Sequence, residues 1–383
     1  MRVDRVNLYH VSLPFLQAFP HALKSGTIAE NTIVEILGNG GVTGYGEGAP
    51  RPYVTGETQE SSIESIKLFL AHPHFPWDLE DISQVWEFVD SVPEGRERNA
   101  ALCAVEMSLL DALGKKEGKP IIEYFPLGHF TEKIFYGAAM PLGGRDQILE
   151  IAEFIKGLGI TRIKLKMDRD FKKNSEMLKV IVDVFERGCD LKIDVNGAWD
   201  LGLSLSHIPL IEEYNIRVVE QPMVPGDQGL SDFSNILKEL NVKLMADESA
   251  CTLEDVKDLV AEGHYDMINV RLSKCGGFRR SLRIIEYLRE QGIVFQIACQ
   301  LGESGLLSAA GRALSLLCRD SLYYDGSYDR FLLRENITLE DVSFGPGGEA
   351  GPLGGSGLGI GVSNENLRKL SHYSETFPNP CQK

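Results

Sequence analysis

The chain has 383 residues, about two domains by the usual size range, and its 43% hydrophobic and 25% charged residues are typical of a soluble globular protein. Its net charge of −16 disfavours nucleic acid and anionic membrane surfaces as partners. The chain start lacks a signal-peptide pattern, no apolar run approaches the roughly 18 residues of a membrane span, and the seven scattered cysteines form no CxxC pair. We therefore expect a cytoplasmic protein with reduced thiols.

The first part of the chain, residues 1–130, combines strand and helix patterns. Residues 2–15 and 30–46 contain alternating, strand-like runs. The clearest helical pattern extends from Asn99 to about Gly118, with apolar residues at helical spacing. These patterns predict a small α+β domain.

The middle part, residues 131–345, repeats one unit. Eight short strand-like runs alternate with helical patterns, namely FYGAAM, RIKLKM, LKIDVN, RVVEQP, KLMADES, MINVRLS, VFQIACQ and SLYYDG. This alternation is typical of a parallel (β/α)₈ barrel, and a doubly wound open sheet is the competing interpretation. After Gly326 the helical pattern fades, and we expect the Gly-rich segment within residues 346–383 to return to the first domain.

In a barrel the functional side chains lie at the carboxyl ends of the strands. The second strand ends with Lys164 and Lys166, which alternate with the apolar Ile163, Leu165 and Met167. Because strand side chains alternate between two faces, the apolar set faces the helices and both lysines point into the barrel mouth.

The next three strands each end in a carboxylate. Asp194 ends the third strand, with Asn196 on the same face; Glu220 ends the fourth and Asp247 the fifth. Taken singly, each acidic residue could be a helix cap or a salt-bridge partner. Together they would repel one another unless a cation lay among them, and oxygen ligands without His or Cys favour Mg²⁺ first and Mn²⁺ second.

These motifs, in this order, resemble the enolase superfamily and its muconate-lactonizing subgroup. The matching segments are KLK at 164–166, DVNGAW at 194–199, VEQP at 219–222, ADES at 246–249, SKCGG at 273–277, ALCAVEMSLLDALGKKEGKP at 101–120 and GLGIGV at 357–362. The resemblance covers nearly the whole chain. It implies an N-terminal α+β capping domain on a modified (β/α)₈ TIM barrel, and it suggests a homo-oligomer.

The resemblance also implies a role for each matched residue. Asp194, Glu220 and Asp247 would bind Mg²⁺, Lys166 would be the acid/base, and Lys164 would orient a substrate carboxylate and lower the pKa of Lys166. The chemistry is consistent, because a proton next to a carboxylate is weakly acidic and a divalent cation stabilises the charge left by its removal. The expected substrate is a small-molecule carboxylate.

The sequence departs from the subgroup on the sixth strand. Arg271 stands where the subgroup has a second catalytic lysine, and strand alternation predicts that Lys274 points away from the side of Arg271. An arginine stays protonated and is a poor base, so a one-base reaction fits best: a lyase reaction, dehydratase-like or o-succinylbenzoate-synthase-like, or a cycloisomerisation. Arg271 would then bind the enediolate or a second carboxylate. The alternative is an ion pair with Asp247 or Glu248.

The remaining strand ends and the cap supply candidates for substrate recognition. The seventh strand ends near Glu303 without a histidine, and the eighth carries Tyr323 and Asp325 where dipeptide epimerases of the subgroup carry two aspartates, which weakens the case for an amine-bearing substrate. The cap loops at residues 15–25 and 48–58 should set specificity. The candidate substrate-binding residues are Asn196, Glu303, Asp325, Tyr323, Arg51, Tyr53 and Thr55.

Three other functions remain open at the level of sequence. One is a racemase or epimerase of an amino-acid derivative or dipeptide, in which Lys166 works with an unusual partner. Another is a non-catalytic descendant that only binds a ligand, which predicts eroded metal ligands. The last is a Schiff-base aldolase using Lys164 or Lys166, which would not require three carboxylates.

Overall fold

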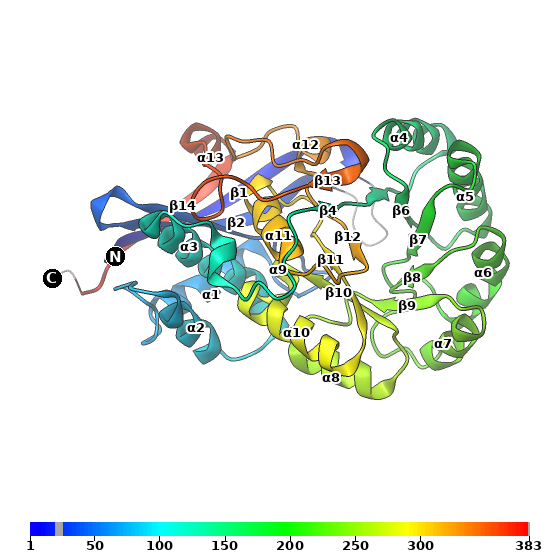
Figure 1. Ribbon diagram of the computed structural model, residues 1–383, viewed down its shortest axis with the longest axis horizontal. Helices are drawn as coiled ribbons and strands as arrows, with labels where there is room; N and C mark the ends of the chain where they lie inside the picture. Colours follow the sequence, from blue (N-terminus) through cyan, green and yellow to red (C-terminus); the bar gives the residue numbers. More distant parts are fainter. Residues whose placement is uncertain (20–25, 382–383) are drawn as a thin grey trace.

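The computed structural model describes residues 1–19 and 26–381, and Figure 1 shows a strand-rich N-terminal part beside a curved parallel sheet with outer helices. The N-terminal sheet is antiparallel in the order β14-β1-β2-β3. Its strands are β1 (Val3–Phe19), β2 (Gly26–Gly38), β3 (Thr43–Gly48) and β14 (Ser371–Pro378). The last strand comes from the other end of the chain, so the sheet joins the two termini.

Three helices pack with this sheet: α1 (Gln59–Leu70), α2 (Ile82–Ser91) and α3 (Asn99–Glu117). Helix α3 is buried on almost every side, because it lies against β3 and also contacts the barrel. The close approach to β3 requires glycine. A Cβ atom at Gly46 would lie 2.0 Å from the carbonyl oxygen of Ala104. The observed helix α3 ends within one residue of the helix predicted from Asn99 to about Gly118.

The second sheet contains eight parallel strands in sequential order from β5 to β12. They are β5 (Ala138–Met140), β6 (Arg162–Lys166), β7 (Asp190–Asp194), β8 (Val218–Glu220), β9 (Lys243–Ala246), β10 (Met267–Arg271), β11 (Val294–Ala298) and β12 (Tyr323–Tyr324). Each predicted strand-like run overlaps one of them, and β7 begins one residue before its run. The capping domain and modified barrel are thus confirmed as the fold class.

Helices follow the strands and cover the outside of the curved sheet (Figure 1). They are α4 (Arg145–Gly157), α5 (Phe171–Phe185), α6 (Leu201–Glu213), α7 (Leu230–Glu239), α8 (Leu253–Glu262), α9 (Leu272–Cys275), α10 (Phe278–Gln291), α11 (Gly305–Leu316) and α12 (Asp329–Leu332). The four short 3₁₀ helices are η1 (Asn39–Gly41), η2 (Arg96–Arg98), η3 (Ile121–Tyr124) and η4 (Pro346–Gly348).

The C-terminal segment contacts the N-terminal part of the chain. Strand β13 (Glu349–Ala350) pairs with β4 (Ile134–Phe135), and the amide of Leu358 then donates to Asp111 on α3 at 2.9 Å. Helix α13 (Asn364–Leu370) and strand β14 follow. Neither was predicted, because the Gly-rich run before them masks any longer pattern.

Two buried carboxylates attach the N-terminal part to the barrel. Glu106 on α3 accepts hydrogen bonds from the amides of Phe278 and Arg279 at the start of α10. Glu47 on β3 accepts from the amide of Ser304, just before α11. A carboxylate suits a helix N-terminus because it accepts from free amides and complements the helix dipole. These contacts fix the cap above the strand ends.

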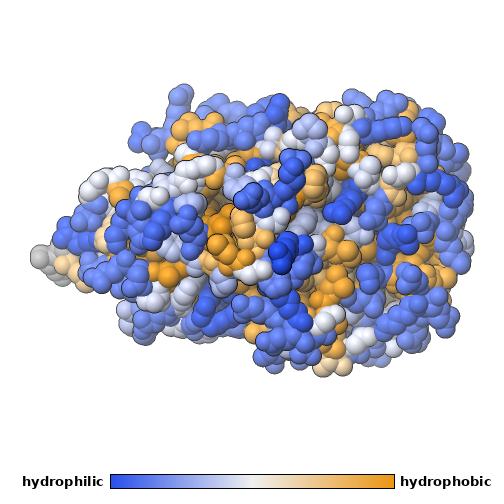
Figure 2. Space-filling view, in the orientation of Figure 1, coloured by the Kyte–Doolittle hydropathy of each residue, from blue (hydrophilic) through white to orange (hydrophobic). Residues whose placement is uncertain are grey.

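The surface and the thiols agree with the composition. Figure 2 shows a face that is mostly hydrophilic, with apolar residues interspersed. All seven cysteines are free thiols. In residues 1–19 and 26–381, no helix has the length and apolar character needed to cross a membrane.

Candidate active site

A cavity of about 320 Å³ opens at the carboxyl ends of the barrel strands. Lys164 and Lys166 on β6 both line it, which agrees with their predicted direction. Both lysines are buried, and burial of charged side chains requires nearby counter-charges.

The three predicted metal ligands lie beside these lysines. Asp194 and Glu220 stand level on β7 and β8, and Asp247 follows β9 about two residues further along. All three are 0% exposed. Gln221 links the strand ends by accepting a hydrogen bond from the amide of Asp247 at 2.9 Å. Three carboxylates from successive strands are therefore buried at neighbouring strand ends.

The lysines neutralise these carboxylates. Lys166 Nζ donates to Asp194 at 2.6 Å and to Asn196 at 2.7 Å, while Lys164 Nζ lies 3.0 Å from Asp325 and 3.2 Å from Glu220. Burial alone would raise the pKa of Asp194, but the two lysine charges outweigh it and hold that pKa below its ordinary value. Burial opposes the charge of Lys164, and the surrounding carboxylates nevertheless raise its pKa. Lys164 is therefore a permanent cation.

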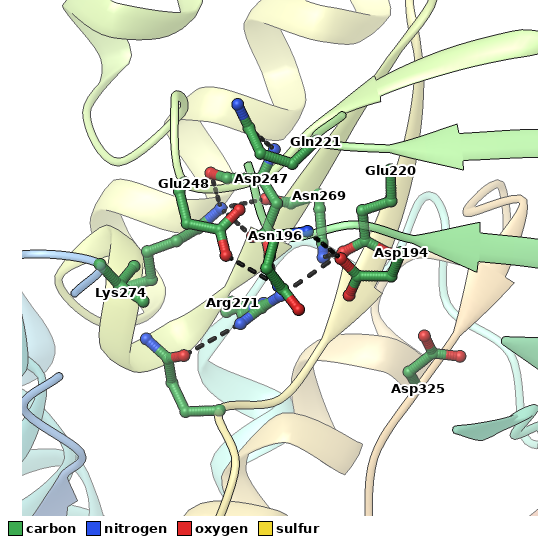
Figure 3. Close-up of polar contacts among 12 residues, drawn as sticks. Asp194, Asn196, Glu220, Gln221, Asp247, Glu248, Asn269, Arg271, Lys274 and Asp325 are labelled. Carbon is green, nitrogen blue, oxygen red and sulfur yellow. Dashed lines mark hydrogen bonds and ion pairs between the residues drawn. The ribbon is translucent and has the colours of Figure 1, made fainter. Parts of the chain in front are cut away.

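Arg271 lies among the carboxylates (Figure 3). Its guanidinium contacts Asp247, lies 3.5 Å from Glu220 and donates to Gln300 at 3.0 Å. The ion pair considered from the sequence thus forms with Asp247. Its partner is Asp247 and not Glu248, which instead accepts a hydrogen bond from Asn196 at 2.9 Å.

Lys274 does not point away from this cluster. It is fully buried, and its Nζ donates to a side-chain oxygen of Asp247 at 2.9 Å and to the carbonyl of Asn269 at 2.6 Å. The expectation from strand alternation was wrong because the strand ends at Arg271 and the next residues form helix α9. Helical geometry turns Lys274 back onto the carboxylate that Arg271 also contacts.

Glu248 and Glu303 line the cavity, whereas Asp194, Glu220 and Asp247 lie behind its lining. Burial raises the pKa of Glu303 to about 8, although the amide of Gln300 donates to it at 2.6 Å. Burial and then the charge of Asp194 raise the pKa of Glu248. One oxygen of Glu248 is buried without a hydrogen bond. The sequence did not predict Glu248 as a residue of the cavity lining. Its position directly after Asp247, at the end of a barrel strand, is the sequence feature that could have indicated it.

Of the two candidate substrate-binding residues at the end of the eighth strand, Asp325 lines the cavity and Tyr323 does not. Asp325 lines it and lies 3.3 Å from Lys192 as well as beside Lys164. The structure directs Tyr323 elsewhere, since its hydroxyl donates to Asp190 at 2.9 Å and its ring lies under Lys192. Tyr323 therefore supports the barrel interior below the site.

The cap supplies a smaller part of the lining than expected. Tyr53 lines the cavity, as does Leu16. Arg51 instead donates to the carbonyls of Leu301 at 2.6 Å and Glu30 at 2.9 Å, and Thr55 is buried away from the cavity lining. The remainder of the predicted specificity loop, residues 20–25, lies outside the described residues.

The donor set fits a hard divalent cation by chemistry. Asp194, Glu220 and Asp247 provide only oxygen atoms and are held by adjacent strand ends. Among the residues that the structure describes, no set of three acidic, His or Cys side chains forms a ready metal site. The ammonium and guanidinium contacts of Lys164, Lys166, Arg271 and Lys274 account for this, because each carboxylate is turned toward a cation.

Comparisons with known proteins find family models and relatives that match most of the chain. Residues 148–366 match the sequence model described as "Enolase C-terminal domain-like", and residues 6–125 match "Mandelate racemase / muconate lactonizing enzyme, N-terminal domain". The chain is 27% identical to a hydrophobic dipeptide epimerase of Enterococcus faecalis, covering 97% of each chain, and 26% identical to an o-succinylbenzoate synthase of Bacillus subtilis, covering 98% of this chain and 99% of the relative.

A solved structure adds the cation to the comparison. The crystal structure of a dipeptide epimerase from Enterococcus faecalis, complexed with Mg and the dipeptide L-Leu-L-Tyr, superimposes with a TM-score of 0.83 at 26% identity. The match covers 94% of this chain and 99% of that one. A protein of similar sequence and fold therefore binds Mg.

Proposed function

The chain belongs to the mandelate racemase and muconate lactonizing enzyme family of the enolase superfamily, and we propose that it removes the proton next to a substrate carboxylate with Mg²⁺ and a single base, Lys166. The expected product arises by elimination or by cycloisomerisation. One observation carries the proposal: Lys166 and Arg271 line the same cavity from β6 and β10, with three strands between them. The two side chains thus approach from different sides of the barrel, and only one can act as a base.

The residues that line the cavity have separate roles in the proposed reaction. Lys166, in its neutral form, accepts the proton at Nζ and returns it to the leaving group or to the product. Lys164 stays protonated and its ammonium holds the substrate carboxylate. Arg271 supplies a second cation for an oxygen of the substrate. Glu303, whose pKa burial raises to about 8, lines the cavity and can exchange a proton near neutral pH.

We propose Asp194, Glu220 and Asp247 as the residues that hold Mg²⁺, with Mn²⁺ as the second choice. A cation bound there would stabilise the negative charge that develops on the substrate carboxylate. Binding requires the guanidinium of Arg271 to leave Asp247. That movement would bring Arg271 toward the substrate space, which it already lines.

A second candidate function is epimerisation of a dipeptide or an amino-acid derivative. The similarity to a hydrophobic dipeptide epimerase over 97% of the chain favours it. Two features of the site disfavour epimerisation. Arg271 replaces the second base, and Asp325, the residue that would bind a substrate ammonium, already contacts Lys164 and Lys192.

Proton NMR in D₂O with Mg²⁺ tests the proposal. The panel contains N-acyl amino acids, dipeptides, hydroxy acids and muconate-like diacids. We expect deuterium exchange at the α-carbon and an eliminated or cyclised product, without inversion. The Arg271→Lys variant supplies a second base, so inversion should appear in the variant only.

The outcomes separate the candidates. Inverted product from the unaltered protein would establish epimerisation and remove the one-base proposal. Calorimetry that finds no Mg²⁺ binding with a carboxylate ligand present would refute the assignment of the metal ligands.

A further inference from the structure

The cavity extends beyond the charged strand ends into a second, apolar part. We call this part the seam cavity, because its lining comes from the first strand of the barrel, from the residues that follow the last strand, and from α4 and α12. Its lining is formed by Ile151, Phe154, Ile155, Leu158, Phe331 and Phe344. The seam cavity is continuous with the space beside the charged residues.

The seam exists because the barrel does not close by regular strand pairing. Strand β12 has only two residues, Tyr323 and Tyr324, and it meets the start of β5 through one hydrogen bond from Gly137 to Tyr324 at 2.8 Å. Beyond that point no strand within residues 1–19 and 26–381 pairs with the free edge of β5. Ala138 and Ala139 line the opening, and their small side chains leave it unfilled.

Aromatic side chains maintain this space. The rings of Phe154 and Phe331 lie 5.8 Å apart, and those of Phe331 and Phe344 lie 5.4 Å apart. Ile155 and Ile160 complete the wall and are almost fully buried. Such a surface gives water few hydrogen-bond partners, so an apolar group would displace that water favourably.

We infer that the substrate carries a large apolar substituent, an acyl chain or an aromatic ring, and that this substituent occupies the seam cavity while the carboxylate lies at Lys164. This inference rests on the proposed function and deepens it by naming the substrate class. The inference is based on the continuity of the cavity. One cavity of about 320 Å³, within the size range of small-molecule sites, includes both the lysines and the seam cavity. A short polar carboxylate would leave the aromatic end empty.

Calorimetry with the whole protein and Mg²⁺ tests this inference. The ligands are unbranched carboxylates from acetate to decanoate. Each added methylene that enters the seam should tighten binding by up to about fourfold, and the gain should stop when the cavity is full. The same ligands without Mg²⁺ show whether the length dependence is independent of the metal.

A matched set of tryptophan variants locates the effect. Leu158→Trp and Ile151→Trp each place a large ring in the seam cavity, and either should remove most of the gain with chain length while leaving acetate unchanged. Leu205→Trp is the control, because Leu205 is an exposed leucine of α6 outside the cavity lining. Thermal melting establishes that each variant is folded, and the second seam variant replaces the first if one fails to fold.

The results separate this inference from the proposed function. Equal affinity for short and long carboxylates, or length dependence that survives both seam variants, would overturn the inference even if α-proton exchange occurs. Length-dependent binding that only the seam variants abolish supports it, even if no exchange is found and the proposed chemistry fails.

Discussion

The two ends of the cavity are built on different principles. At the charged end, strand ends present carboxylates, and each one is held by an ammonium or guanidinium group, as for Asp194 with Lys166 and Asp247 with Arg271. At the seam, helices and the C-terminal segment present aromatic rings, such as Phe331 and Phe344. The barrel strands therefore position the charged groups, while the elements around an unclosed edge shape the apolar end of the cavity. The following substitutions act on one end and leave the other in place.

The largest expected effect is that of Lys166→Ala. Loss of the base should slow α-proton exchange by about 10²–10⁴-fold. Binding of decanoate should remain measurable by calorimetry, because the seam is unchanged. Lys179→Ala, an exposed lysine of α5, is the control and should leave exchange unaltered. Exchange that persists in Lys166→Ala would disprove the role of Lys166.

The next effect concerns stability at the charged end. Asp247→Asn keeps the side-chain size but removes the charge that both Arg271 and the fully buried Lys274 contact. An unpaired buried cation should lower the free energy of unfolding by about 3–5 kcal/mol, measured by urea denaturation. Asp183→Asn breaks an exposed ion pair with Lys179 and should cost at most about 1 kcal/mol. Equal losses in the two variants would contradict the charge network described here.

A further effect is expected from Glu303 and depends on pH. Its pKa is about 8 in the folded protein and near 4.5 when the chain is unfolded, so its contribution to stability is complete below about pH 4.5 and is lost as the pH rises through 8. Glu303→Gln retains a neutral group. It should nearly match the unaltered protein at pH 4.5 and exceed its free energy of unfolding by up to about 5 kcal/mol at pH 9. Parallel stability profiles would show that Glu303 is ionised.

The smallest effect is expected at the cap. Leu16 lines the cavity but is 47% exposed, so Leu16→Ala removes only part of an apolar contact. Decanoate binding should weaken by about three- to tenfold, with acetate unaffected. Leu339→Ala, an exposed leucine outside the cavity lining, should change neither affinity. A loss of acetate binding in Leu16→Ala would indicate that this residue acts on the charged end.

Much of the charged end could be predicted from the sequence because strands alternate strictly. The direction of Lys164 and Lys166 follows from the apolar residues that alternate with them. The ends of the parallel strands β6, β7 and β8 bring Lys166, Asp194 and Glu220 to the same level. The same rule failed at Lys274, because a strand pattern cannot reveal that the chain turns into a helix after Arg271. It also could not place Arg51 or Tyr323, whose polar groups find partners away from the cavity.

The sequence alone determined the order of strands and helices in the barrel and the acidic and basic residues at the strand ends, since each depends on local periodicity or on a residue's own chemistry. That Arg271 stands in place of a lysine follows from the resemblance to the muconate-lactonizing subgroup. Only the tertiary structure decided that Arg271 contacts Asp247, that Glu248 and Glu303 face the cavity and that the barrel opens at a seam between β5 and β12. These features join residues far apart in the chain, and their contacts depend on how the sheet curves and where its last strand ends.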